Sequence, residues 1–204
     1  MRVLAFGAHP DDIEIGMGGL IAKYSKKNHN VSMVVASIPN KKEIRRMEAE
    51  SSAKMLGAEI LILDIEPNKL IFSRELVRIF DEIIREHSPE IIYTHWNHDS
   101  HQDHVAVANA VISSTRKNDC SLYMYEQTIP GGIVPYSFRS QSFVDISKEI
   151  DLKMNSLIQH GSQVGANNEW WLYGIKGRAM YRGYQIHVNY AEAFEVVKEI
   201  KNIG

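Results

Sequence analysis

Two short segments of the sequence are rich in histidine and aspartate, the side chains that bind divalent metals and carry protons in enzymes. The first is His9-Pro10-Asp11-Asp12-Ile13-Glu14. The second runs from residue 95 to residue 104 and contains His95, His98, Asp99, His101, Asp103 and His104. Two histidines and one carboxylate with one open position form a ligand set of catalytic zinc, whereas oxygen ligands alone are typical of magnesium or calcium. The two segments therefore predict a divalent metal site, provided that the fold brings them together.

Each segment directly follows a stretch whose apolar pattern predicts a buried strand, at residues 3–7 and 91–94. Further strands are predicted at residues 31–37, 59–63 and 121–125, and they alternate with helices at residues 18–27, 41–56, 73–87 and 105–115. This alternation predicts βαβ units with right-handed crossovers and a parallel sheet. Ligands bind to such sheets in the crevice beyond the carboxyl ends of the strands. We therefore expect both segments to lie at the same edge of the sheet.

The length and composition fit one domain that spans residues 1–204. Of the 204 residues, 44% are hydrophobic and 24% are charged, and a chain of this size buries roughly 70% of the surface that its unfolded form exposes. The predicted fold class is α/β, a Rossmann-like three-layer sandwich with a mostly parallel sheet. After residue 126 the pattern is less regular, and it predicts a turn or flexible loop at residues 129–132, a helix at 146–160 and a terminal helix at 190–200.

Charge and composition argue against several classes of protein. The net charge of −2 and the pI of about 6.5 argue against a nucleic-acid binder, which needs a basic excess on one face. No stretch approaches the ~18 apolar residues of a membrane helix, and the apolar start of the chain is too short for a signal peptide. Cys120 is the only cysteine, so an intrachain disulfide is excluded. We expect a cytoplasmic protein that neither binds nucleic acid nor inserts into a membrane.

The composition of each His/Asp segment can also be explained by a purely structural role. Asp11 and Asp12 fit the solvated N-terminus of a helix, where the helix dipole favours negative charge. Ser100 and Asp103 fit a capping pair for the helix that follows them. Either explanation is adequate for one segment alone. Because both segments follow strands of the same predicted sheet, the metal site is the stronger interpretation.

The two segments resemble the signatures of the PIG-L/LmbE family of zinc-dependent N-deacetylases. The family's Ala-His-Pro-Asp-Asp-x-Glu signature corresponds to residues 8–14, and its His-x-Asp-His signature corresponds to residues 101–104. Further similarity covers residues 15–19, Arg45, Glu48-Ala49, Gly57, Ser162-Gln163 and residues 190–194. The opening of the chain is especially similar to the bacterial enzymes that deacetylate a GlcNAc-malate conjugate in bacillithiol synthesis. The resemblance covers most of the chain.

The resemblance implies a role for each residue of the two signatures. It makes His9, Asp12 and His104 the ligands of a zinc ion, with Fe²⁺ or another divalent metal as alternatives. Asp11 becomes the general base that takes a proton from water, which zinc binding brings to a pKa of about 7. His101 becomes the group that stabilises the tetrahedral oxyanion in its protonated form. Asp103 would orient His101 and keep it charged.

Other polar residues near the signatures have two explanations each. Arg45 could bind an anionic part of a substrate, or it could lie on the solvated face of a helix. Asp99 could act as a second acid or contact the substrate. Glu14 could hold a metal ligand in place through a hydrogen bond, or it could simply be an acidic residue at a helix N-terminus. His95 and His98 flank Trp96, and they fit a sugar-stacking wall or an ordinary loop.

Three further features of the sequence concern packing and assembly. Four isolated histidines, at positions 29, 87, 160 and 187, are interpreted as surface or structurally satisfied residues. Gly16, Gly18 and Gly19 lack the spacing of a dinucleotide-binding loop, so we interpret them as close packing of the first helix on the sheet. Trp170, Trp171 and Tyr173 follow a flexible 165–168 segment and fit a lid, a carbohydrate platform or, slightly better, a subunit interface.

The predicted function is a zinc-dependent hydrolase that removes the N-acetyl group from a GlcNAc-type amino sugar conjugate. The alternatives are a sugar- or nucleotide-binding module without catalysis and an inactive, metal-bound scaffold. The loop at residues 37–42 is short and lacks the longer Gly- and Thr-containing loop of many family members. The aglycone and the acyl group of this small-molecule substrate therefore stay open. By resemblance to the family, the chain is expected to form a homo-oligomer.

Overall fold

The computed structural model describes residues 1–127, 134–165 and 170–201. The predicted loop at residues 129–132 and most of the 165–168 segment lie outside the described residues. The strands are β1 (Arg2–Gly7), β2 (Asn30–Val35), β3 (Glu59–Ile62), β4 (Ile91–His95), β5 (Ser121–Tyr125), β6 (Ser142–Asp145) and β7 (Ala191–Lys198). The helices are α1 (Asp12–Lys26), α2 (Lys42–Leu56), α3 (Arg74–His87), α4 (Gln102–Ser114), α5 (Ile150–Ile158), α6 (Gly161–Val164) and α7 (Trp170–Gln185), with a short 3₁₀ helix at Pro67–Lys69.

Within the described residues, seven strands form one sheet in the order β3-β2-β1-β4-β5-β7-β6. Strands β1 to β5 are parallel to one another, and β7 runs antiparallel to both β5 and β6. The predicted mostly parallel α/β sheet is therefore confirmed. The strand order reverses between β1 and β4, because the chain first builds outward to β3 and then returns to the other side of β1. A reversal of this kind opens a crevice at the carboxyl ends of the two strands.

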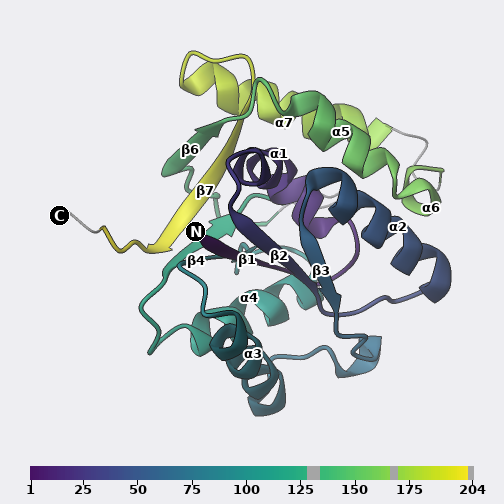
Figure 1. Ribbon diagram of the computed structural model, residues 1–204, viewed down its shortest axis with the longest axis vertical. Helices are drawn as coiled ribbons and strands as arrows, with labels where there is room; N and C mark the ends of the chain where they lie inside the picture. Colours follow the sequence, from purple (N-terminus) through teal and green to yellow (C-terminus); the bar gives the residue numbers. More distant parts are fainter. Residues whose placement is uncertain (128–133, 166–169, 202–204) are drawn as a thin grey trace.

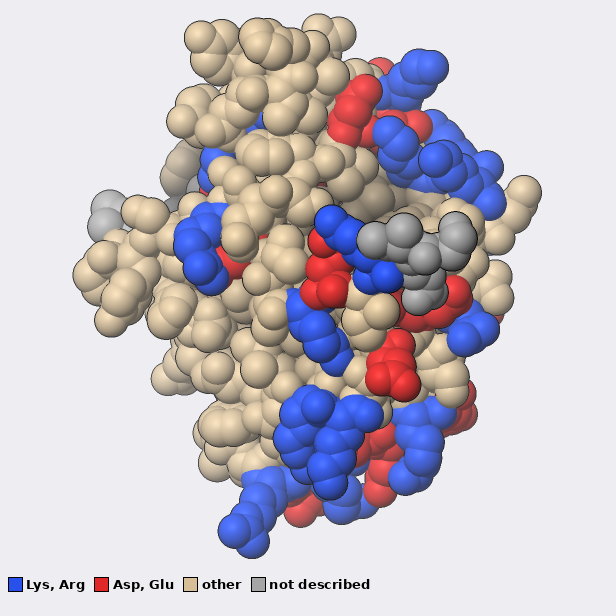
Figure 2. All heavy atoms as spheres, turned by 90° about the vertical axis from the view of Figure 1, so that its left-hand side faces the viewer, with Lys and Arg blue, Asp and Glu red and all other residues tan. Residues whose placement is uncertain are grey.

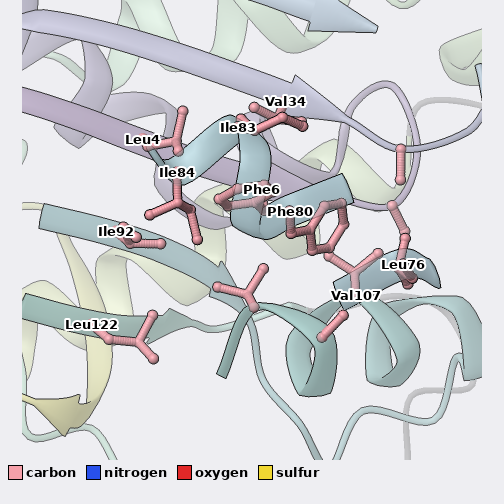
Figure 3. Close-up of a cluster of buried hydrophobic side chains, with 14 of the residues drawn as sticks. Leu4, Phe6, Val34, Leu76, Phe80, Ile83, Ile84, Ile92, Val107 and Leu122 are labelled. Atoms are coloured by element: carbon pink, nitrogen blue, oxygen red, sulfur yellow. The ribbon is translucent and has the colours of Figure 1, made fainter. Parts of the chain in front are cut away.

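Helices cover both faces of the sheet, which gives the three layers seen in Figure 1. Alternate residues of a strand point to opposite faces. Leu4 and Phe6 of β1 therefore pack against α3 and α4, in the cluster drawn in Figure 3 with Phe80 and Val107. Val3 and Ala5 pack on the other face, in a cluster that contains apolar residues of α1 and α2. The C-terminal helices α5 and α7 lie outside this second layer (Figure 1).

The expected terminal helix at residues 190–200 is wrong, because residues Ala191–Lys198 form strand β7 between β5 and β6. The sequence Ala-Glu-Ala-Phe-Glu favours a helix by intrinsic propensity. Burial overrides that propensity, since residues 191–195 are all buried and both of their acidic side chains have cationic partners. Strand β6 and helix α7 were not anticipated either, and the helix expected at 146–160 begins only at Ile150.

Helix α1 begins at Asp12, six residues before the predicted start, and it is interrupted at Met17, where φ is −147° and ψ is 21°. Glycines allow its close packing: a β-carbon at Gly16 would overlap the ring of Tyr125, and one at Gly19 would lie 2.8 Å from Ile146. The packing interpretation of these glycines agrees with this geometry.

Among the described residues, no helix has the length and apolar character needed to span a membrane.

Candidate metal centre

The two His/Asp segments meet at the carboxyl ends of β1 and β4, on the two sides of the strand-order reversal. The first segment forms the tight turn between β1 and α1, and the second connects β4 to α4. β1 and β4 are neighbouring parallel strands, in which Val3 pairs with Ile91 and Ala5 pairs with Tyr93. The segments are far apart in the sequence, so the sheet itself brings them together.

The turn after β1 is closed by the side chain of one of its own residues. The Asp12 carboxylate accepts a hydrogen bond from the backbone N–H of His9 at 2.7 Å. Asp11, the residue before the helix, has a φ of 96°, a left-handed conformation that a non-glycine residue rarely adopts. This backbone geometry directs Asp11 and Asp12, although adjacent, into different surroundings. Asp12 is buried in the cluster described next, whereas the Asp11 side chain keeps 14% of its surface exposed.

Five side chains form a compact group that we call the His/Asp cluster: His9, Asp12, His95, His101 and His104. Asp12 lies at its centre, with Oδ2 at 3.6 Å from His9 Nδ1 and Oδ1 at 3.3 Å from His104 Nε2. Two triads in the cluster have ligand atoms within 4.8 Å of one another, namely His9, His101 and His104, and Asp12, His95 and His104. Both triads share His104. The ligand set implied by the family resemblance takes His9 from the first triad, Asp12 from the second and the shared His104.

The hydrogen bonds of His95 argue against it as a metal ligand, although it lies in one triad. Its Nε2 accepts the backbone N–H of Ala8 at 2.9 Å and lies 3.2 Å from Asp12 Oδ2, so two protein groups already surround the nitrogen that a metal would need. Burial and the proximity of His104 lower the pKa of His95 to about 4, so the ring is neutral, as this acceptor role requires. The His95 ring stacks on the His104 ring with centroids 4.0 Å apart. His95 is thus a buried support for His104, which neither interpretation of the sequence anticipated.

Two carboxylates outside the cluster face its histidines. Asp99 Oδ2 lies 3.3 Å from His104 Nδ1, and its Oδ1 accepts the backbone N–H of His101. Asp103 Oδ2 lies 3.0 Å from His9 Nε2. Carboxylates that bond the far nitrogen of a histidine fix the orientation of its ring and raise its basicity toward a metal. The Asp103 carboxylate was expected to orient His101, but it faces His9, because α4 begins at Gln102 and directs this side chain toward the β1 turn.

His101 caps helix α4 through its ring. Its Nδ1 accepts the backbone N–H of Asp103 at 3.1 Å, so the proton of the neutral ring is on Nε2. Burial and the neighbouring His104 lower the pKa of His101. The protonated form expected from the sequence is therefore disfavoured, but Nε2–H is still a hydrogen-bond donor. The alternative explanation of this segment made Ser100 part of the cap, whereas the structure gives this role to His101.

The electrostatics of the cluster favour one positive charge beside Asp12. Burial raises the pKa of Asp12, but His104 and His95 outweigh it and hold that pKa well below its usual value. Burial lowers the pKa of His104, yet Asp12 and Asp99 raise it to about 10. An ionised carboxylate at the centre of imidazole nitrogens fits a divalent cation, which would take the place of the His104 proton.

Asp11 has a different environment from that of Asp12. Burial, followed by the charge of Asp12, raises the pKa of the Asp11 carboxyl to about 7. The Arg45 guanidinium lies 3.8 Å from Asp11 Oδ2 and donates to the carbonyl oxygen of Pro10 at 2.9 Å. Arg45 is only 4% exposed, so it is not on a solvated helix face. Its contacts hold the turn that presents Asp11.

Glu14 of α1 is buried behind the turn and contacts α2 and the connection between α5 and α6. Its Oε1 accepts the Ser52 hydroxyl of α2 at 2.6 Å and lies 3.0 Å from Nε2 of His160, just after α5. His160 is fully buried and is not a surface residue, and its Nε2 has Glu14 as a partner whereas its Nδ1 has none among the described residues. Gln127 donates to Asp12 Oδ1 at 3.1 Å, a contact with no signal in the sequence.

His98 is exposed next to Tyr136, whereas Trp96 and His95 are buried. His95, Trp96 and His98 therefore do not form an exposed wall on which a sugar could stack.

Comparison with known proteins places this geometry in a family. Residues 4–115 match the family model described as GlcNAc-PI de-N-acetylase, PIG-L. The chain is 27% identical over 224 residues to the diacetylchitobiose deacetylase of Thermococcus kodakarensis, an alignment that covers 98% of this chain and 84% of the relative. It is also 27% identical to the probable N-acetyl-alpha-D-glucosaminyl L-malate deacetylase 2 of Bacillus subtilis, with 79% of this chain and 83% of that protein covered.

A solved structure agrees with the sequence relatives. The N,N'-diacetylchitobiose deacetylase from Pyrococcus horikoshii superposes with a TM-score of 0.82 and 26% identity, over 96% of this chain and 83% of that one. The matched family region begins in β1, ends just after α4 and contains every residue of the His/Asp cluster. The chain therefore belongs to the GlcNAc-PI de-N-acetylase (PIG-L) family of deacetylases.

Proposed function

We propose that this protein is a metal-dependent hydrolase that removes the N-acetyl group from a GlcNAc-type amino sugar conjugate. The observation that carries the proposal is the convergence of His9, Asp12 and His104, with Asp11 beside them and outside the ligand set. The names of the relatives add support for the substrate class, because they act on diacetylchitobiose or on a GlcNAc-malate conjugate. The short 37–42 loop leaves the aglycone undefined.

The metal is proposed to be zinc held by His9, Asp12 and His104, since two imidazoles and one carboxylate suit that ion. Fe²⁺ is the alternative, because such donors also bind other divalent transition metals. When bound, the metal would supply a Lewis acid that polarises the amide carbonyl and lowers the pKa of water. The Asp103 and Asp99 carboxylates would fix the orientation of the His9 and His104 rings, so that the other nitrogen of each ring faces the metal.

Asp11 is proposed as the proton carrier. With a pKa of about 7, its carboxyl takes a proton readily and gives it up readily at neutral pH. It would accept a proton from the attacking water as the new C–O bond forms at the acetamide carbon. The same proton would pass to the nitrogen as the C–N bond breaks, which releases acetate and a free amine. Arg45 is proposed to fix Asp11 in place instead of contacting the substrate, because it is buried against the turn.

His101 is proposed to stabilise the oxyanion of the tetrahedral intermediate. The hydrogen bond at its Nδ1 leaves an Nε2–H that can donate without a net charge on the ring. Loss of one oxyanion donor typically costs ~10²–10³ in kcat. His101→Ala should therefore retain the metal and lose about this much activity, whereas loss of His104 should remove the metal as well.

The test combines metal analysis with acetate release. Purified protein should contain about one zinc per chain by mass spectrometry, and acetate release from a panel of GlcNAc conjugates should stop with chelator and return with zinc. Metal without release from any conjugate would favour the inactive scaffold. Ligand binding without metal or release would favour the binding module.

Asp11→Asn tests the proposed chemistry separately from metal binding. The amide retains the size of the side chain but does not accept the proton, so turnover should fall ~10²–10⁴-fold while zinc content is unchanged. The matched control is Asp151→Asn, the same substitution at an exposed position of α5. Wild-type turnover in Asp11→Asn would refute the assigned base.

A further inference from the structure

Helix α7 has an exposed face without any charged residue, which we call the α7 face. Five of its large side chains are more than half exposed, with values from 52% for Met180 to 78% for Tyr184. The face consists of Trp170, Tyr173, Gly174, Gly177, Met180, Tyr181 and Tyr184. Their spacing of three and four residues places all of them on about a third of the helix circumference. In Figure 2, the upper left of the surface is largely free of charged side chains, whereas Lys, Arg, Asp and Glu gather at the upper right.

The charged residues of α7 lie outside this face, although the Arg182 guanidinium lies near one of its rings, 5.4 Å from the centroid of Tyr181. Arg178 donates to the carbonyl oxygen of Ile15 in α1 at 2.7 Å. Arg182 forms a two-point ion pair with Glu126 after β5. Lys176 lies over the ring of Tyr190, 5.8 Å from its centroid. Burial of Trp171, Ile175 and Ala179 fixes the opposite side of the helix on the molecule. The α7 face is therefore an apolar surface with a fixed orientation.

The two glycines of this face border open space. A β-carbon at Gly174 or Gly177 would meet nothing within 4 Å, unlike one at Gly16, Gly19 or Gly183. A glycine inside a helix weakens it relative to alanine, so an exposed glycine needs another reason. Glycine on a helix surface allows a second backbone to approach closely. Two of them at the centre of an aromatic face indicate that another helix crosses there.

The pattern of the α7 face is nearly symmetric about Gly177. Trp170 and Tyr184 are each seven residues from it, and Tyr173 and Tyr181 are each four residues from it. Two antiparallel copies of such a helix place aromatic residues against aromatic residues and Gly177 against Gly177. An interface around a two-fold axis requires this kind of self-complementarity, because the same patch meets itself. We propose that the α7 face is the surface through which two copies of this chain associate.

The size and composition of the face are sufficient for this partner. Aromatic side chains bury 150–250 Å² each, so four that are more than half exposed contribute on the order of 500 Å² per chain. This is a large share of the ~800 Å² per partner of a standard interface, and tyrosine, tryptophan and methionine are the residues enriched there. The inference does not depend on the proposed deacetylase activity, and it can fail or hold independently of it.

Cysteine cross-linking tests the register. The Cα atoms of Gly177 in two crossing helices would lie about 4–5 Å apart, within disulfide range, if the axes are 8–10 Å apart. Gly177→Cys should therefore form a covalent dimer under mild oxidation. Gly174→Cys is the matched control, because it lies on the same face but about 9 Å from its own copy along the axis, beyond disulfide range. The native Cys120 is buried and does not contribute.

Charge substitutions test the same pairing without cross-linking. Sedimentation of the wild-type chain should give an even-numbered assembly, and Tyr181→Glu or Tyr173→Lys should weaken self-association at least tenfold. The double variant Tyr173→Lys with Tyr181→Glu should restore association, because position 173 of one copy faces position 181 of the other. Phe72→Glu is the control for an added charge, since Phe72 is equally exposed at 55% but lies before α3.

Several results would overturn the proposal. A monomeric wild-type chain at all concentrations would exclude a stable pair, and no rescue in the double variant would exclude the antiparallel register. Equal cross-linking of Gly174→Cys and Gly177→Cys would indicate random collision. If a monomeric wild type binds chito-oligosaccharides and Tyr181→Glu abolishes that binding, the α7 face is a carbohydrate platform and not an interface between copies.

Discussion

At the scale of single residues, the adjacent carboxylates Asp11 and Asp12 have opposite acidities. The surrounding imidazoles lower the pKa of Asp12, whereas burial and the charge of Asp12 raise the pKa of Asp11 to about 7. The cause is the left-handed backbone at Asp11, which separates the two side chains. A non-glycine residue held in such a region costs on the order of 1–3 kcal/mol and persists only where its surroundings fix it. Here Arg45 supplies part of that support.

The carboxylates behind the histidines lead to a prediction about metal affinity. Asp99→Asn retains an acceptor for the His101 N–H but loses the charge that faces His104. Zinc affinity should fall about 10–100-fold, since loss of such an outer partner typically has this effect. Competition with a chromogenic chelator measures it. Asp103→Asn, which faces His9, should behave in the same way, and Asp119→Asn, an exposed control, should not. Unchanged affinity in both site variants would place the metal elsewhere.

At the scale of elements, the interruption of α1 at Met17 is the feature that needs most support. It frees the carbonyl oxygen of Ile15, which accepts from Lys153 Nζ at 2.9 Å. It also frees the backbone N–H groups of Gly19 and Leu20, which donate to Glu192 at 2.9 and 2.7 Å. Lys153 and Glu192 form a buried ion pair with each other at 2.5 Å. Lys153 and Glu192, together with Arg178 of α7 at the same Ile15 carbonyl oxygen, thus replace the backbone bonds that the break in α1 removes, and they connect α1 to α5, α7 and β7.

This arrangement predicts strong coupling between the two charges. Glu192→Gln or Lys153→Met alone leaves one buried charge without its partner, which costs about 3–5 kcal/mol of unfolding free energy. The double variant removes both charges, so it should cost clearly less than the sum of the single variants. Urea denaturation of the four proteins measures the coupling. A simple sum of the two losses would mean that the pair does not act as a unit.

The core of the fold could be predicted from the sequence because it depends on local pattern. Alternating strands and helices up to residue 125 fix the parallel sheet, and the positions of both His/Asp segments after strands fix the edge where they meet. β7 could not be predicted, because its pairing with β5 and β6 and its buried glutamates outweigh a helical composition. His95 was missed as a support of His104 because its hydrogen bond to Ala8 depends on the alignment of two distant strands.

The pairing of carboxylates with histidines could not be predicted from the sequence either. The His-x-Asp-His signature indicates that His101, Asp103 and His104 act together, but not in which direction each side chain points. That direction depends on where α4 begins. His101 uses its ring to cap the helix, which turns the Asp103 carboxylate toward His9. Sequence spacing therefore predicts the members of a site better than their contacts.

At the scale of the whole molecule, a metal in the His/Asp cluster would tie two halves of the fold together. His9 lies in the connection between β1 and α1, Asp12 is the first residue of α1, and His104 belongs to α4 on the opposite face of the sheet. An ion held by all three would link these layers at the point where the strand order reverses. A ligand that binds only the folded chain stabilises all of it.

Metal binding should therefore raise the unfolding temperature of the entire domain. Zinc at ~100 times its dissociation constant adds ~2.7 kcal/mol, and for a chain of this length that is a rise of about 5–10 °C in Tm. Differential scanning calorimetry of chelator-treated protein, with and without zinc, measures the shift. Magnesium should produce little shift, because it prefers oxygen ligands. His104→Gln should unfold at the same temperature with or without zinc, whereas His187→Gln should respond like the wild type, because His187 is exposed in the connection between α7 and β7. An equal zinc response in His104→Gln would show that the stabilising ion binds outside the cluster.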